Sequence, residues 1–245
     1  MSRRPLAPTR SNPPRRDRQA CRPRRSPRFG VAAGPLRAAL LASMLAVLPS
    51  LLTALLLPPA ARAEGAPWTL ERDRDGIVIH TRPVAGSGID EFRGTALVPA
   101  PVDAVRAVLR NVDDFELWFR NTSESRLLSR EANVQLQYTV IDAPWPVSDR
   151  DNVFRSETTR DPSTGVVRIA VTADPDRQPE QPDRVRVRHA RGEWLLEPVA
   201  PEQTRVTFTM HLEPGGGVPD WLLNVRVVET PFEALTNLRA QLAKR

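Results

Sequence analysis

The sequence predicts an α+β helix-grip fold, in which a curved antiparallel β-sheet wraps around a long C-terminal α-helix. The first observation is an alternation of apolar and polar side chains in residues 135–140, 184–188, 193–197 and 205–213. A period of two is typical of antiparallel strands with one solvated face. The second observation is an apolar stripe at steps of three and four in residues 219–244, which predicts one long amphipathic helix. Such a helix can cover the apolar face of the sheet.

Upstream of these segments, the pattern indicates two strands followed by two helices. A β-rich run at Ile77–His80 is followed by a second predicted strand over residues 89–98. Apolar residues at helical spacing predict a short helix over residues 101–110, with proline near its first turn. Asp113, with Glu116 three residues later, has the pattern of a capping box and predicts the start of the second helix.

The terminal helix is separated from the last strand by Gly215-Gly216-Gly217. Its apolar stripe consists of Trp221, Leu222, Val225, Val228, Phe232, Leu235, Leu238 and Leu242. Pro231 lies inside this helix and has no N–H to offer the carbonyl of Val227, so we expect a kink or a loosened turn there.

Residues 1–63 are predicted to be a secretory signal peptide rather than part of the fold. An arginine-rich region precedes an apolar run at residues 38–57, and Ala61 and Ala63 provide the small side chains of a cleavage site after Ala63. The run is long enough to cross a bilayer, so an uncleaved anchor remains an alternative. Residues 64–245 then form one domain that is periplasmic or secreted, or anchored to the inner membrane and facing the periplasm.

The predicted leader dominates the charge of the chain. It contains 12 of the 35 basic residues but only Asp17 of the 29 acidic ones, which leaves 23 basic and 28 acidic residues and a net charge of −5. Nucleic-acid binding is therefore not expected, because it needs a basic surface on the domain itself. Cys21 is the only cysteine, so cleavage would leave no thiol for a disulfide or a nucleophile.

Several motifs, in their order along the chain, resemble the START (StAR-related lipid-transfer) domain family, here in an exported bacterial form. They are the Trp68 lead-in with Gly76-Ile77-Val78-Ile79, Phe92-Arg93-Gly94, Pro101-Val102-Asp103-Ala104-Val105, Trp118, Pro144-Trp145-Pro146-Val147-Ser148-Asp149-Arg150-Asp151, and residues 215–222. The proline-rich element that ends in Arg150-Asp151 is the most specific of them. The resemblance implies an apolar tunnel that holds one lipid, in a monomer with no catalytic residues and no cofactor. The chain departs from the family in its shorter N-terminal part, where the first family helix is expected to be reduced or absent.

The resemblance places Arg150 near the tunnel, where it can pair with an acid or meet the polar end of a ligand. A charge beside an apolar cavity is costly unless it is paired, and Asp149 and Asp151 are adjacent candidates for this pairing. The other candidate ligand contacts are apolar and aromatic residues, namely Trp118, Tyr138, Trp194, Phe208, Met210, Phe232 and Leu235. Ordinary core packing is the alternative for each of them, and the Tyr138 hydroxyl needs a partner if it is buried.

We therefore expect a protein that binds a hydrophobic molecule and carries or senses it, with transient membrane contact. Trp145 lies between two prolines, and two arrangements are expected for it. It is either exposed, where it can contact a membrane or form a lid, or packed against the helix. Two other functions stay open. One is a cyclase or aromatase that uses Arg150, Asp151 and Tyr138. The other is a protein-interaction module with a filled core. His80, His189 and His211 show no metal-ligand spacing, so no metal site is expected.

Overall fold

The structure of the domain is a computed structural model that describes residues 65–244, with the side chains of Trp221 and Leu222 outside the described set. The predicted leader and its cleavage site lie outside the described residues. The strands are β1 (Thr69–Arg74), β2 (Ile77–Arg82), β3 (Glu91–Val98), β4 (Thr122–Glu131), β5 (Val134–Ile141), β6 (Arg150–Arg160), β7 (Val167–Ala173), β8 (Val185–Arg186), β9 (His189–Ala200) and β10 (Gln203–Glu213). The helices are α2 (Val102–Arg110), α3 (Phe115–Trp118) and α4 (Asp220–Leu242), with short 3₁₀ turns η2 (Val112–Asp114) and η3 (Pro175–Arg177).

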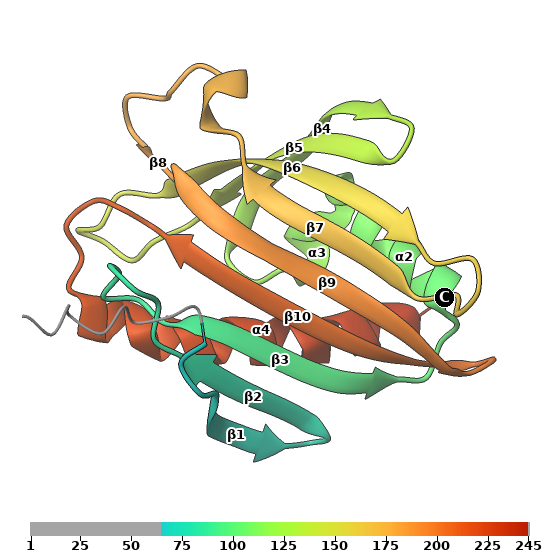
Figure 1. Cartoon of the computed structure of the whole chain (residues 1–245). Coiled ribbons are helices and arrows are strands. Elements are labelled where there is room, and N and C mark those ends of the chain that lie inside the picture. Colours follow the sequence, from blue (N-terminus) through green and yellow to red (C-terminus); the bar gives the residue numbers. More distant parts are fainter. Residues whose placement is uncertain (1–64, 245) are drawn as a thin grey trace, which may run out of the picture. The chain divides into compact units, whose positions relative to one another are not determined.

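The strands form one open sheet in the order β1-β2-β3-β10-β9-β7-β6-β5-β4. All neighbours in this order are antiparallel, and β8 adds a short parallel pairing to β6. Helices α2, α3 and α4 lie on the same face of the sheet, and α4 packs along β2 and β3 (Figure 1). The predicted α+β helix-grip fold is therefore confirmed.

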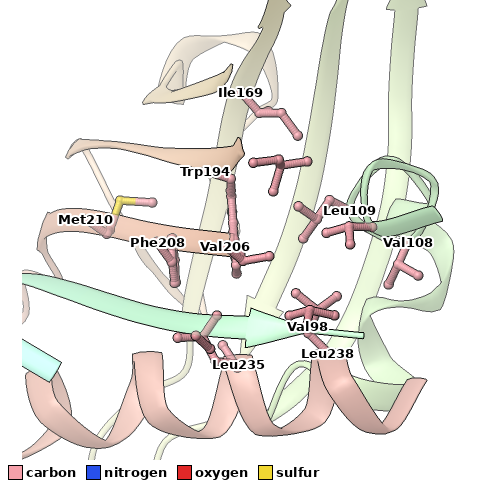
Figure 2. Close-up of a cluster of buried hydrophobic side chains, with 14 of the residues drawn as sticks. Val98, Val108, Leu109, Ile169, Trp194, Val206, Phe208, Met210, Leu235 and Leu238 are labelled. Atoms are coloured by element: carbon pink, nitrogen blue, oxygen red, sulfur yellow. The ribbon is translucent and has the colours of Figure 1, made fainter. Parts of the chain in front are cut away.

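The close approach of α4 to β3 depends on Gly94. A Cβ atom at this position would lie 2.9 Å from Cβ of Pro231 and 3.0 Å from Cδ1 of both Ile79 and Leu235. The absence of a side chain thus lets the proline-containing turn of α4 rest directly on the strand. Around this contact, the main hydrophobic cluster joins the helices to the sheet (Figure 2).

Several local predictions need correction. The segment after Trp68, for which no strand was predicted, forms the edge strand β1, and the strand expected at residues 184–188 is only the two-residue β8. The predicted capping box is wrong, because α3 has no side-chain cap. Instead, Asp113 accepts a hydrogen bond from Leu127 N at 3.0 Å, and Glu116 accepts one from Ser125 N at 2.8 Å. Both carboxylates therefore attach the α3 region to β4.

No helix among residues 65–244 is long and apolar enough to cross a membrane. The same residues contain no group of three or more histidine, cysteine or acidic side chains arranged to hold a metal ion.

Candidate ligand-binding pocket

A pocket of about 800 Å³ lies between the helices and the face of the sheet that they cover. This volume is in the range of sites that bind small molecules and cofactors. The pocket runs along β5 and β6, because alternate residues over the full length of both strands line it. The helices α2, α3 and α4 supply the opposite side.

One wall of the pocket is apolar. It contains Phe92, Leu109, Phe115, Trp118, Ile169, Val171, Trp194, Phe208, Met210, Leu223 and Val227. The rings of Trp194 and Phe208 are stacked, with their centroids 3.8 Å apart, and Phe115 meets Trp118 edge to face at 5.4 Å. Figure 2 shows Trp194, Phe208 and Met210 together on the strands. A wall of this kind binds hydrocarbon by removing it from water, at about 25 cal/mol per Å² buried.

The wall formed by β5 and β6 is mainly polar, although Val134, Ile141 and Phe154 also line it, whereas the sequence led us to expect apolar contacts such as Tyr138 from this part of the sheet. Gln135, Gln137 and Thr139 of β5, with Asn152 and Ser156 of β6, are all buried and line the pocket. Nδ2 of Asn152 contacts Oγ1 of Thr139 at 3.3 Å, while Oδ1 of Asn152 has no hydrogen-bond partner among the described residues. A buried amide oxygen without a partner costs free energy, so this atom is ready to accept a hydrogen bond from a ligand.

The apolar residues of β5 face away from the pocket. Leu136, Tyr138 and Val140 alternate with the polar-wall residues. Tyr138 and Val140 form a second buried cluster with Val153 of β6, and the partly buried Leu136 packs against it. This face of the sheet is also covered near Asp151, where the segment between η3 and β8 lies against Arg186, while β8 itself extends the sheet beside β6. The prediction that Tyr138 contacts the ligand is therefore wrong: residues on both faces of β5 are buried, and the pocket lies on the polar face of this strand.

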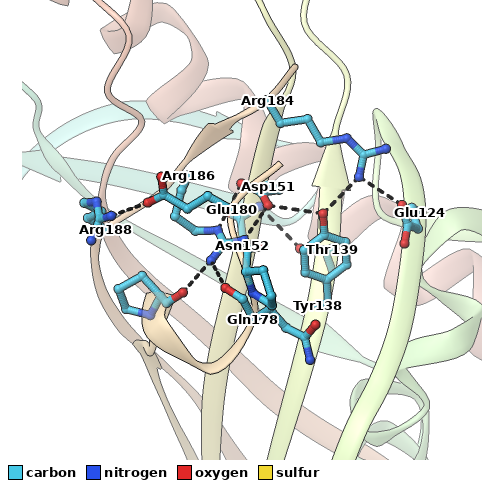
Figure 3. A network of polar contacts seen from close by, with 12 residues as sticks. Glu124, Tyr138, Thr139, Asp151, Asn152, Gln178, Glu180, Arg184, Arg186 and Arg188 are labelled. Atoms are coloured by element: carbon cyan, nitrogen blue, oxygen red, sulfur yellow. Dashed lines mark hydrogen bonds and ion pairs between the residues drawn. The ribbon is translucent and has the colours of Figure 1, made fainter. Parts of the chain in front are cut away.

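A buried ion-pair network holds the covering segment in place on this second face (Figure 3). Both carboxylate oxygens of Asp151 accept hydrogen bonds from Arg186, at 2.7 and 3.0 Å, and the two side chains are 0% and 2% exposed. Arg186 also donates to the carbonyl groups of Pro175, Gln178 and Pro179. The arginine therefore ties the segment before β8 to β6.

Tyr138 belongs to the same network. Its hydroxyl donates to Oδ2 of Asp151 at 3.2 Å and accepts a hydrogen bond from Arg184 at 2.9 Å. Burial raises the pKa of Tyr138 from its usual value, partly offset by the hydrogen bond from Arg184. The partner expected for its hydroxyl is thus a protein side chain. The cluster of Arg150, Asp151 and Tyr138 that a cyclase would need does not form in the pocket, because Asp151 and Tyr138 lie outside the pocket lining.

Arg150 is 8% exposed and lines the pocket. Its guanidinium donates to the carbonyl of Ser148 and, at 3.1 Å, to that of Gly215. The prediction that Asp151 balances Arg150 is wrong, since Asp151 is committed to Arg186. Burial lowers the pKa of Arg150, and the charge of Asp149 offsets this only in part. Arginine nevertheless stays protonated, so a buried positive charge remains at this end of the pocket.

The predicted site residues separate into two groups. Five line the pocket: Arg150, Trp118, Trp194, Phe208 and Met210. Tyr138, Phe232 and Leu235 do not; Phe232 packs beneath Arg72, whose guanidinium carbon is 4.8 Å from the ring centroid. The polar residues of β5 and β6 were missed, because polar residues at alternate positions read as a solvated face.

The loop that joins β5 to β6 forms the rim of the pocket at the Arg150 end. Pro144 and Val147 line the pocket, whereas Trp145 between them is 92% exposed. Of the two arrangements expected for Trp145, the structure shows the exposed one. An almost fully exposed tryptophan next to two apolar pocket-lining residues is unusual for a protein surface that contacts only water.

The long helix packed on a curved sheet, with an elongated pocket between them, places the protein in the class of α+β domains that bind small ligands. Comparison with known proteins identifies the family. Residues 53–245 match the START domain model, and the chain belongs to this family. An uncharacterized protein of Pseudomonas aeruginosa is 36% identical over 186 residues, which cover 76% of this chain and 92% of the relative. Mouse phosphatidylcholine transfer protein is 26% identical over 165 residues, which cover 65% of this chain and 76% of the relative.

Solved structures agree with this assignment. The crystal structure of a STAR-related lipid transfer protein from Xanthomonas axonopodis has a TM-score of 0.68 and 40% identity, and the match covers 72% of this chain and 98% of that one. Human StAR-related lipid transfer protein 5 has a TM-score of 0.65 and 19% identity, with 83% and 96% coverage, and shows the shared fold alone.

Proposed function

We propose that this domain binds one lipid or similar hydrophobic molecule in its pocket, and carries or senses it outside the cytoplasm without chemically changing it. The observation that carries the proposal is the pocket of about 800 Å³ with a continuous apolar wall, in a chain of the START family. Lipid transfer by named relatives supports the same conclusion. In this proposal Trp118, Trp194, Phe208 and Met210 contact hydrocarbon, and Arg150 offers a polar contact at its end of the pocket.

The direct test is native mass spectrometry of residues 64–245 after incubation with a membrane lipid extract. We expect one hydrophobic molecule to be retained per protein chain, released on denaturation with unchanged mass. Retention of no hydrophobic molecule from any lipid class would reject the proposal and favour the alternative of a protein-interaction module. Release of a chemically altered molecule would favour the cyclase alternative.

Transient membrane contact is part of the proposal, and Trp145 is the residue that supports it. Trp145→Ala is expected to weaken binding to phospholipid vesicles about tenfold or more, because burial of an indole ring in the interface contributes several times RT. Sedimentation with vesicles measures this binding. Leu70→Ala is the matched control, since Leu70 is also exposed but lies on β1, outside the pocket lining. Equal binding by the two variants would contradict a role for Trp145.

A further inference from the structure

The pocket is strongly cationic although the domain is acidic. Its lining contains seven arginines, Arg106, Arg110, Arg120, Arg130, Arg150, Arg160 and Arg226, against two acidic residues, Asp90 and Asp142. Arg120 and Arg226 both lie near Glu233, with ion-pair distances of 2.8 and 4.0 Å. The remaining positive charge is concentrated at the two ends of the pocket.

Four of these arginines form a cluster at the end opposite Arg150, and we call Arg106, Arg110, Arg130 and Arg160 the arginine cluster. Arg106 and Arg110 lie one turn apart on α2, Arg130 is the penultimate residue of β4, and Arg160 ends β6. A hydrogen bond links two of them, because Nη2 of Arg130 donates to the backbone carbonyl of Arg110 at 2.8 Å. Arg150 and Arg160 are at opposite ends of β6, roughly 30 Å apart along the strand.

The positive charge of the cluster is only partly neutralised. Arg106 and Arg160 share a single carboxylate oxygen of Asp103, at 3.3 and 2.7 Å. Among residues 65–244, no ion pair with a carboxylate is recorded for Arg110 or Arg130, and Nε of Arg106 is buried without a hydrogen-bond partner. Guanidinium groups in this arrangement can form charge-assisted hydrogen bonds with phosphate.

A path of polar groups leads from the cluster into the pocket. Arg130 donates to Oε1 of Gln135 at 3.4 Å, and Nε2 of Gln135 donates to Oε1 of Gln137 at 3.3 Å. This orients the amide nitrogen of Gln137, for which no partner is recorded among the described residues, as a free donor on the polar wall. The polar groups of a lipid that lie next to its head group, such as ester carbonyls, can hydrogen-bond to this polar wall, while the hydrocarbon of the lipid faces the apolar wall.

We propose that the arginine cluster binds the anionic phosphate head group of the lipid, with the acyl chains extending from the cluster along the apolar wall of the pocket. The proposal rests on the lipid-binding function proposed above and specifies the ligand class and its orientation. Arg150 is less suited to this task, because its guanidinium already donates to two backbone carbonyls.

The test is competition between two lipids with identical acyl chains, anionic phosphatidylglycerol and zwitterionic phosphatidylcholine, presented in equal amounts and counted by native mass spectrometry. We expect the wild-type protein to retain phosphatidylglycerol preferentially. Arg110→Gln should reduce this preference about tenfold, the value of one charge-assisted hydrogen bond. No hydrogen bond or ion pair of the Arg110 side chain is recorded among the described residues, so the variant should fold.

Arg155→Gln is the matched control, because it removes the same charge from β6 at a residue outside the pocket lining. An equal preference of wild type for both lipids, or the same preference in both variants, would overturn the proposal. Titration with inorganic phosphate distinguishes the source of the anion: Arg110-dependent binding of phosphate, without any preference among lipids, would also overturn it. If no lipid of either kind is retained, the proposed function itself fails.

Discussion

Replacing Asp151 with alanine is expected to lower the free energy of unfolding by about 3–5 kcal/mol, because it leaves the buried guanidinium of Arg186 without its counter-ion. Both side chains are almost completely inaccessible to water. The substitution also removes the acceptor for the Tyr138 hydroxyl, whose other contact is a hydrogen bond from Arg184. Urea denaturation followed by circular dichroism measures the change.

Two controls separate the loss of a buried pair from a general effect of charge. Glu193→Gln breaks the solvent-exposed pair with Arg168 and should change stability by less than about 1 kcal/mol. The double substitution Asp151→Leu and Arg186→Met should recover part of the stability lost in Asp151→Ala, because no unpaired charge remains, although the three carbonyl groups that Arg186 contacts lose their donor. A loss below about 1 kcal/mol in Asp151→Ala would show that the network does not hold the segment before β8 on the sheet.

The fold could be predicted from the sequence where one side of an element faces water. β10 alternates over its whole length, and α4 carries an apolar stripe, so both were located within a few residues. β1 was missed because nearly all of its side chains are exposed, which leaves no apolar side to detect. The 3₁₀ turn and α3 together span only residues 112–118, too short for helical periodicity to be clear.

The site was harder to predict than the fold because a ligand pocket breaks the usual rule for buried surfaces. Trp194 and Phe208 were recognised since an apolar wall resembles a core. Gln137 and Asn152 were not, because sequence alone cannot distinguish a polar residue that faces water from one that faces a pocket. Their burial depends on helices and strands that are distant in the sequence, and this information is present only in the tertiary structure.

Replacing Gly94 with valine is expected to separate α4 from the sheet and to impair both folding and ligand binding. Even a single Cβ atom would lie 2.9 Å from Pro231, and the branched methyl groups would have to displace the helix further. Overpacking of this kind costs about 1–3 kcal/mol and can cost more where the backbone cannot move. Since α4 contributes Leu223 and Val227 to the pocket, its displacement should also reduce lipid retention.

Thermal unfolding and native mass spectrometry of the same preparation test both parts of this prediction. Thr95→Val is the matched control, because it places valine at the next position of β3, on the opposite face, where Thr95 contacts Thr207 across the strands at 3.3 Å. The control should lose no more than about 1 kcal/mol, the value of one hydrogen bond, and should keep its lipid. If Gly94→Val behaved like the control, the contact between Pro231 and Gly94 would not be what sets the position of α4. If Gly94→Val lost stability but retained as much lipid as the wild type, the pocket walls formed by the strands would be sufficient for binding. The packing of α4 on the sheet would then contribute to stability and not to ligand binding.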